Sequence, residues 1–426
     1  MKNNPLYIIL ESKIFIEKIL QLLGTPKILW IALSGGRDSV CLLYIAIKVI
    51  NRLREILSLS MILPKIYAIH INHHFHKDAA KFENFCHTLC AKFNVPLFVE
   101  HLHLHKFNEN IAREARYYFF YKHLNKNDVI WLAHHRDDQS ETFIMRLMRR
   151  AGVKGLTGIP HIRSLGKGKL MRPLLGVTGE VINAYALKYN LNWIDDISNL
   201  YINFDRNYVR HNIIPYIKIR WPDAIESLAL CVDYLKESDN LLNCFAKDML
   251  QAISNNHSII PIDKIIIIEN ARLKLLIRYC LLCLKFPMPP KKRLDTLINQ
   301  IKKTNGSMFC IRWENVEARC WRRIFFILYT KKKSLSIFYI NLIKLQSSFL
   351  KKMDLSLLTI IHIKCSEFFF INGHKRNIKK ILQFANIPIW ERNSIMLLFI
   401  INELIAIIGI NFIFVSDNCN LKKLII

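Results

Sequence analysis

The chain has 426 residues, which suggests two or three domains, and 52% of them are hydrophobic, which is ample for a sizeable core. With 61 Lys and Arg against 33 Asp and Glu its formal net charge is +28, which favours a polyanionic partner such as nucleic acid, although AT-rich genomes also produce lysine-rich chains. The eleven cysteines are odd in number and irregularly spaced, which argues against a disulfide scaffold and indicates reduced thiols in a cytoplasm.

The N-terminal half predicts an α/β domain. Residues 1–10 have no long apolar core and do not resemble a signal peptide. Between residues 28 and 196 short apolar runs alternate with helical patterns, which indicates a Rossmann-like parallel sheet with helices on both faces. We expect strands at 28–33, 65–72, 97–101 and 129–133, and a fifth near Trp193. Ligands of such sheets bind at the carboxyl ends of the strands, so the polar clusters that follow these runs should meet in one crevice.

A six-residue loop follows the first expected strand and precedes a helical run: Ser34, Gly35, Gly36, Arg37, Asp38 and Ser39. The glycines let backbone amides turn inward and the serines add hydroxyls, so the loop predicts a phosphate site at a helix N-terminus. Asp38 would repel a bare phosphate unless a divalent cation lay between them, which favours ATP with Mg²⁺. The alternative is that the serines and Asp38 only cap the helix.

This loop resembles the SGGxDS loop of the N-type ATP pyrophosphatases, which cleave ATP between its α and β phosphates to activate a carbonyl. After the second expected strand come His70, Asn72 and His73, which resemble the His-x-Asn-His-Gly-Leu-Arg element of the lysidine synthetases, with His74 and His76 in place of its Gly and Arg. Three close histidines also suggest zinc, but their spacing is not that of helical zinc ligands.

A helical run at 109–121 carries Arg113 and Arg116 on one face. Paired guanidinium groups can clamp phosphates, although with Glu109 and Glu114 they can equally form a solvated, ion-paired face. The run resembles the family's Asn-x-Glu-x-x-x-Arg-x-x-Arg-Tyr element, with Phe107 in place of its Asn. The resemblance implies a catalytic role for Arg113, facing phosphate or base, and a tRNA contact for Arg116.

The second strong motif, at 132–142, follows the fourth expected strand and opens a helix. Asp138 as N-cap with Glu141 three residues later would be a capping-box variant, but capping does not explain His134 and His135 at the same strand end. A carboxylate here, Asp138, can share magnesium with Asp38, and an imidazole can move a proton near neutral pH. The string resembles the family's Ala-His-His-x-Asp-Asp-Gln-x-Glu-Thr, which makes His134 the candidate proton carrier.

Basic residues then gather in two places. Arg149 and Arg150 precede a glycine-rich segment at 152–158, and Lys154 lies within it. We expect this segment to be a flexible cationic loop that contacts a nucleic-acid backbone or is simply exposed. Arg206 and Arg210 are four residues apart on an expected helix, with phosphate or tRNA contact as the functional interpretation and helix surface as the alternative. Residues 172–175 match the family's Arg-Pro-Leu-Leu.

Beyond Trp221 the pattern becomes helical to about residue 285. Cys280 and Cys283 form a C-x-x-C that invites comparison with the iron-sulfur clusters of some tRNA thiolases, but their leucine-rich context favours core packing. From about residue 334 alternating runs at 355–363 and 412–415 predict a small sheet, and a basic loop at 372–380 enters a helix. The apolar stretch at 395–415 is interrupted by polar residues and predicts buried strands, not a membrane span.

The motifs together resemble the tRNA(Ile)-lysidine synthetases. The resemblance implies a PP-loop catalytic domain at 1–220, a helical tRNA-binding domain at 221–333 and a small α+β tRNA-binding domain at 334–426. It also implies ATP-dependent ligation of free lysine to C2 of the wobble cytidine of a CAU-anticodon tRNA(Ile), through an adenylated cytidine, with reading changed from AUG to AUA. Asp38 and Asp138 would bind Mg²⁺, the protein would be cytoplasmic, and a homodimer stays open. The alternatives are a tRNA thiolase of the same superfamily and a catalytically inactive RNA-binding protein.

Overall fold

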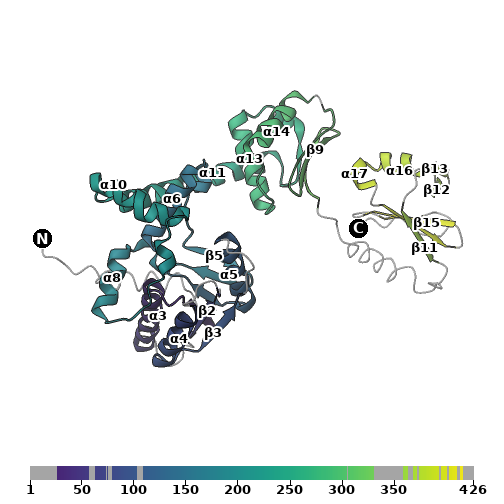
Figure 1. Cartoon of the computed structure of the whole chain (residues 1–426). Helices are drawn as coiled ribbons and strands as arrows, with labels where there is room; N and C mark the ends of the chain where they lie inside the picture. The colour runs from purple at the N-terminus through teal and green to yellow at the C-terminus, as the bar shows by residue number, and fades with distance from the viewer. Residues whose placement is uncertain are drawn as a thin grey trace. The chain divides into compact units, whose positions relative to one another are not determined.

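The structure, a computed structural model, divides into two compact units, Met1–Leu241 and Leu242–Ile426, which are described separately (Figure 1). It describes residues 26–56, 63–72, 74, 79–102, 109–304, 306–330, 358–362, 368–371, 374–392, 395–400, 403–409 and 413–415.

The first unit is built on a six-stranded sheet in the order β3-β2-β1-β4-β6-β5. The strands are β1 (Ile28–Ala32), β2 (Lys65–Asn72), β3 (Leu97–His101), β4 (Val129–Trp131), β5 (Ile162–Leu165) and β6 (Gly168–Met171). β1 pairs in parallel with both β2 and β4, β2 with β3, and β4 with β6, whereas the edge strand β5 is antiparallel to β6. The predicted α/β class is confirmed, with one antiparallel edge strand in an otherwise parallel sheet.

Helices cover both faces of this sheet. The helices that pack on it are α3 (Arg37–Ile56), α4 (Ala79–Lys92), α5 (Glu109–His123) and α8 (Gly179–Lys188). The first unit also contains α6 (Arg136–Met148), α7 (Val153–Leu156), α9 (Asp205–Tyr208), α10 (Ile214–Arg220) and α11 (Ala224–Ile253), which continues into the second unit. Successive side chains of a strand point to opposite faces, so Leu29 and Ile31 of β1 pack with α3, α4 and α8, while Trp30 packs with Phe120 of α5. A strand buried on both faces needs the near-continuous apolar sequence that β1 has.

The strand order also fixes where a ligand can bind. The chain runs from β1 outward to β2 and β3, then returns to place β4 on the other side of β1. The connections after β1 and β4 therefore leave the sheet in opposite directions and open a crevice at the carboxyl ends of these two strands. The two strongest sequence motifs are these connections.

Three local expectations are wrong. No strand forms at Trp193; residues 191–196 have irregular backbone, and the strand beside β4 is β6. The helix after β4 begins at Arg136 with His135 as N-cap, so Asp138 is the third helical residue and not the cap. The glycine-rich segment at 152–158 includes the short helix α7, because the Arg146 guanidinium donates to the carbonyls of Gly155 and Gly158, both at 2.8 Å.

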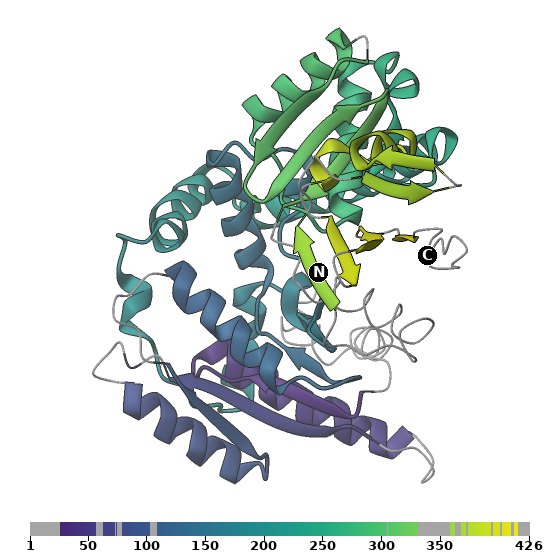
Figure 2. The same ribbon diagram turned by 90° about the vertical axis from the view of Figure 1, so that its right-hand side faces the viewer.

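The second unit begins with the predicted helical segment, which the structure confirms and extends by a sheet. Its helices are the end of α11, α12 (Ile262–Ile266), α13 (Asn270–Cys283) and α14 (Lys291–Lys303). They pack against a four-stranded antiparallel sheet, β7 (Ile259–Pro261), β10 (Ile324–Tyr329), β9 (Val316–Trp321) and β8 (Phe309–Trp313), which the sequence analysis did not anticipate (Figure 2). Cys280 is in this core as expected, but Cys283, the last residue of α13, is exposed.

The C-terminal part of the second unit contains the expected small sheet. Strands β11 (Leu358–His362), β14 (Met396–Ile400), β15 (Glu403–Ile408) and β16 (Ile413–Val415) pair in that order, beside a hairpin of β12 (Phe368–Ile371) and β13 (His374–Asn377) and the helices α16 (Ile378–Phe384) and α17 (Ile389–Arg392). The basic segment expected as a loop thus forms strand β13 before it enters α16. Among the residues that the structure describes, no helix is both long and apolar enough to cross a bilayer.

Candidate active site

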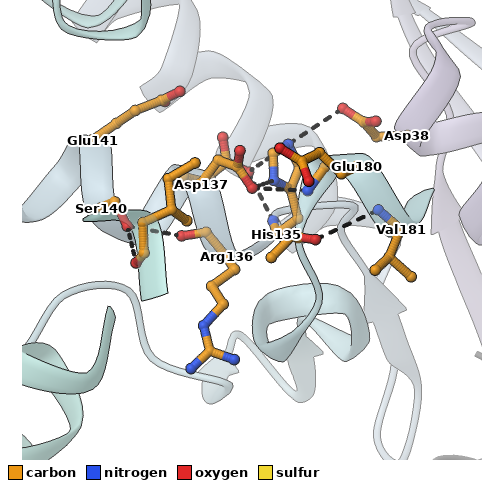
Figure 3. A network of polar contacts seen from close by, with 12 residues as sticks. Asp38, His135, Arg136, Asp137, Ser140, Glu141, Glu180 and Val181 are labelled. Carbon is orange, nitrogen blue, oxygen red and sulfur yellow. Dashed lines mark hydrogen bonds and ion pairs between the residues drawn. The ribbon is translucent and has the colours of Figure 1, made fainter. Parts of the chain in front are cut away.

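The connections after β1 and β4 meet at His135. Its Nε2 lies 3.5 Å from Oδ2 of Asp38, at the start of α3, and 3.8 Å from Oδ2 of Asp138, in the first turn of α6. Figure 3 shows Asp38 and the α6 residues on either side of this imidazole. Two sequence motifs about a hundred residues apart therefore share one cluster of charges at the switch point of the sheet.

The loop after β1 has the backbone that its glycines predict. Gly35 has φ +88°, and an added Cβ would lie 3.1 Å from the Phe82 ring, so a larger residue would be strained and crowded. The Gly35 carbonyl accepts from the amide of Ile194, which ties residues 191–196 to the loop. The hydroxyls of Ser34 and Ser39 lie 3.1 Å apart, and Ser39 Oγ donates to the Gly36 carbonyl at 2.8 Å. The serines thus brace the turn, and phosphate binding by it stays a prediction.

His135 is a buried cation held by carboxylates. Its Nδ1 lies 3.1 Å from Asp137 Oδ2, an oxygen that also accepts from the Gly179 amide at the start of α8. Burial opposes the charge, but Asp138, Asp137 and Asp38 outweigh it and raise the pKa of His135 to about 10. Burial would raise the pKa of Asp38, yet His135 and Arg37, whose Nε lies 3.0 Å away, hold that pKa below its usual range.

Two arginines close the other side of Asp138. Arg206 donates to Asp138 Oδ1 at 2.6 Å and to Glu141 Oε2 at 2.8 Å, and Arg210 donates to Glu141 Oε1 at 2.6 Å and to Asp138 Oδ1 at 3.3 Å. Glu141 is 1% exposed and Asp138 6% exposed, so these are buried ion pairs. Arg210 belongs to a π-helical segment, Val209–Ile213, that follows α9. The tRNA contacts expected of Arg206 and Arg210 stay predictions, since here both guanidiniums are engaged with the strand-end carboxylates.

His134 has the opposite surroundings. Its Nδ1 accepts a hydrogen bond of 3.2 Å from Nε of Arg172, the residue after β6. Burial, together with the positive charges of Arg172, Arg206 and Arg113, lowers the pKa of His134 to about 3, although Asp138 acts in the other direction. His134 is therefore a neutral imidazole at physiological pH.

A cavity of about 390 Å³ opens beside the charge cluster. Its lining includes residues from both motifs and from the helices that follow them: Arg37, Asp38, His135, Asp137, Glu180 and Arg210. A volume of this size lies within the range of small-molecule sites. The mixture of cationic and anionic groups suits a ligand that carries both phosphate and amine.

The two predicted magnesium ligands differ in how far their oxygens are engaged by other side chains and amides. Asp38 faces the cavity, but both oxygens of Asp138 are taken: Oδ1 by the two arginines, and Oδ2 by the His135 amide at 2.8 Å. No group of three or more His, Cys, Asp or Glu side chains suited to a metal ion occurs in the part of the chain that the structure describes. Magnesium held by Asp38 and Asp138 stays a prediction.

The other predicted residues lie outside this cluster. Arg113 and Arg116 are exposed on α5, with the Arg113 guanidinium 5.5 Å from the centre of the Tyr117 ring. Arg149, Arg150 and Lys154 are also exposed, and Arg149 pairs with Asp205 at 3.0 Å.

The polar cluster after β2 supports the sheet edge. Nδ1 of His70 donates to the Leu33 carbonyl at 2.9 Å, Asn72 donates to Glu83 at 2.6 Å, and His74 stacks on His101. His73 and His76 lie outside the described residues. Sequence reasoning assigned no role to His135, Asp137 or Arg172. The first two belonged to the string at 132–142, and the only signal of Arg172 was its place in the Arg-Pro-Leu-Leu match.

The chain is similar to known proteins over most of its length. A PP-loop domain model matches residues 11–217, a TilS substrate binding domain 263–323 and a TilS substrate C-terminal domain 369–419. The tRNA(Ile)-lysidine synthase of Buchnera aphidicola subsp. Schizaphis graminum is 32% identical over 419 residues, covering 93% of this chain and 92% of that protein. The enzyme of that name from Haemophilus influenzae is 31% identical over 431 residues, covering 92% of this chain and 97% of the other.

Among solved structures, the U34-tRNA thiolase NcsA from Methanococcus maripaludis with its 4Fe-4S cluster is 18% identical with a TM-score of 0.42, covering 54% of this chain and 80% of its own. A likeness at that level carries no argument about function.

Proposed function

Because the chain belongs to the tRNA(Ile)-lysidine synthase family, we propose that it is an ATP-dependent ligase that joins free L-lysine to C2 of the wobble cytidine of a tRNA(Ile) with a CAU anticodon. The product, lysidine, would change the codon read from AUG to AUA. We further propose that the enzyme acts in the cytoplasm. Light scattering would distinguish a monomer from a homodimer.

One observation carries the proposal. Asp38 of the loop after β1 and His135 of the string after β4 are 3.5 Å apart and line the same cavity. A nucleotide at the loop would therefore have its phosphates next to a buried imidazolium, a preorganised positive charge that needs no reorganisation when negative charge develops.

In the proposed first step, the C2 oxygen of cytidine attacks the α phosphate of ATP. A bond from that oxygen to phosphorus forms, the bond between the α phosphorus and its bridging oxygen breaks, and pyrophosphate leaves. Ser34, Gly35, Gly36 and Ser39, with the N-terminus of α3, would hold the pyrophosphate portion as its charge grows. His135 and Arg37 would act on the same charge from the cavity side.

In the second step the lysine ε-amine attacks C2 of the adenylated base. A carbon-nitrogen bond forms, the carbon-oxygen bond to the adenylate breaks and AMP leaves with the electron pair of that bond, and the proton that the amine loses passes to water. The carboxylates that line the cavity, Asp38, Asp137, Glu141 and Glu180, are of the right charge to attract a lysine side chain.

The tRNA would be held by positive surface residues. Arg116, Arg149, Arg150 and Lys154 are exposed cations on or near α5, α6 and α7, which supports their proposed contact with the phosphate backbone. The two terminal domains would supply further contacts, consistent with the substrate-domain models that match them.

The direct test is ATP-dependent incorporation of labelled lysine into tRNA. We expect incorporation into a CAU-anticodon tRNA(Ile) transcript and much less into methionine tRNAs with the same anticodon. Binding of the transcript without turnover would favour the inactive RNA-binding alternative. Incorporation of labelled sulfur by anaerobically purified protein, with an iron-sulfur absorption band, would favour the thiolase.

A further inference from the structure

Arg172 is a buried cation without a carboxylate among its hydrogen-bond acceptors in the described part of the chain. It is 2% exposed, and its backbone amide is fixed by the carbonyl of His161 at 2.9 Å. Its guanidinium donates to three neutral acceptors: Nδ1 of His134 at 3.2 Å, the Pro160 carbonyl at 2.7 Å and the Tyr117 hydroxyl at 3.3 Å. Burying a guanidinium is costly, so its place in the fold calls for an explanation.

The contact with His134 constrains where that ring carries its hydrogen. A guanidinium has only donors, so Nδ1 of His134 must offer a lone pair. An imidazolium has no lone pair, and the Nδ1–H tautomer has it on the other nitrogen. The contact therefore requires a neutral ring with its hydrogen on Nε2.

We propose that Arg172 is a positioning residue that locks His134 in the Nε2–H form, so that His134 presents a hydrogen-bond donor to an oxygen of the reacting nucleotide or base. The proposal rests on the proposed function, because it assigns His134 to the same site. It replaces the role of proton carrier, since a ring held this way has no free lone pair with which to take a proton. The Arg172–Tyr117 contact also ties this lock to α5, on which Arg113 lies over the Tyr117 ring.

A purely structural role is the competing explanation, in which Arg172 only fastens the β5–β6 hairpin to α5. The two explanations differ at His134. A fastening role makes no demand on the tautomer, whereas the lock requires one tautomer and loses it when the donor is removed.

The test is nitrogen NMR of full-length protein labelled in histidine, with the His134 signals assigned by their loss in His134→Gln. We expect wild-type His134 to carry hydrogen on Nε2 only, and Arg172→Met to give a mixture of tautomers. Arg172→Lys, which keeps one donor, should restore much of the wild-type pattern. A wild-type His134 protonated on Nδ1, or a pattern unchanged in a folded Arg172→Met variant, would overturn the proposal.

Kinetics supply the second readout. We expect Arg172→Met to lower the rate constant for pyrophosphate release about 10- to 100-fold, as for other partners that orient a functional imidazole, while KM for ATP changes less than about twofold. The matched control is Arg163→Met: Arg163 is exposed and lies 4.3 Å from the centre of the same Tyr117 ring, and its removal should leave the His134 tautomer unchanged.

The two proposals fail separately. If Arg172→Met does not fold, a wild-type His134 with its hydrogen on Nδ1 still overturns the lock, and Arg172→Lys supplies the folded comparison. If wild-type protein forms no lysidine although His134 shows the expected tautomer, the proposed function fails and the lock stands. If wild-type protein forms lysidine, and Arg172→Met loses the Nε2–H tautomer of His134 without any fall in rate, the positioning role fails and the proposed function stands.

Discussion

Two adjacent histidines at the end of β4 lie in opposite electrostatic surroundings. His135 is surrounded by the carboxylates of Asp138, Asp137 and Asp38, which outweigh its burial and raise its pKa to about 10. His134 meets the guanidinium of Arg172, and burial together with nearby guanidinium charge lowers its pKa to about 3. Backbone geometry explains the division, since His135 is extended, with φ −126° and ψ −174°, and neighbouring side chains on extended backbone point to opposite sides.

The difference teaches how one strand end can supply both a fixed positive charge and a neutral donor. Pairs of titratable groups whose pKa values are pushed apart by their surroundings are typical of sites that divide chemical roles. In the proposed reaction the charged ring would act on the phosphates, and the neutral ring on the base or its adenylate. Substitutions around His135 and around His134 test this division of roles separately.

The largest effect is expected from Asp38→Asn on the carboxylate side. This variant removes a negative charge that holds His135 and Arg37, and that is also the predicted magnesium ligand. Pyrophosphate release should fall at least about 100-fold. Asp233→Asn, an exposed carboxylate on α11, is the control and should retain activity. A near-normal rate in Asp38→Asn would remove Asp38 from the site, and a higher magnesium requirement in that variant would favour the ligand role.

Arg206→Met should destabilise the fold on the same side. It leaves Glu141, 1% exposed, with Arg210 as its remaining guanidinium partner in the described contacts, and breaking a buried ion pair costs about 3–5 kcal/mol. Arg149→Met breaks an exposed pair with Asp205 and should cost no more than about 1 kcal/mol. Urea denaturation compares the two, and equal costs would mean that the buried network adds no stability.

Tyr117→Phe tests the guanidinium side. It removes the hydroxyl that accepts from Arg172 and leaves a buried donor without that partner, at a cost of about 1–3 kcal/mol. Tyr118→Phe, on the same helix but exposed, should change the free energy of unfolding by less than about 0.5 kcal/mol. A Tyr117→Phe variant as stable as Tyr118→Phe would show that the Arg172 guanidinium is satisfied without the phenol.

A pH dependence of stability is expected from His135. The pKa of folded His135 is about 10 against an ordinary 6.5, so the stability due to its charge is fully present below pH 6.5 and is lost as pH rises towards 10. The difference in unfolding free energy between wild type and His135→Gln should shrink over that range, by at most about 1.4 kcal/mol per pH unit. Urea titrations at several pH values measure it, and a difference that does not vary with pH contradicts a charged His135.

Much of the catalytic unit could be predicted because its strands have a strong local signal. β2 and β3 have the bounds expected from the sequence, 65–72 and 97–101, and each begins directly after a proline, Pro64 or Pro96. The hairpin of β5 and β6 was missed because both strands have four residues and glycines surround their turn. The sequence predicts a strand near Trp193, but in the structure this segment binds the loop after β1, because the Ile194 amide donates to the Gly35 carbonyl.

The sequence indicated where the candidate site lies, but it did not show which cations neutralise the carboxylates of the site. Asp38 suggested a divalent cation because a lone carboxylate beside a phosphate loop is unfavourable, whereas the fold provides Arg37 and His135 as its counter-charges. The ion pairs of Arg206 and Arg210 with Asp138 and Glu141 join residues 65 to 72 positions apart, and no local pattern encodes them. The domain boundaries stay predictions.

The central claim is that the loop after β1 and the string after β4 form one nucleotide site. A double-mutant cycle on ATP affinity, measured by calorimetry with wild type, Asp38→Asn, His135→Gln and the double variant, tests it most directly. If the two segments form one site, we expect a coupling free energy of about 0.5–3 kcal/mol between the two substitutions. Effects that add without coupling, or variants that bind ATP as wild type does, would contradict it.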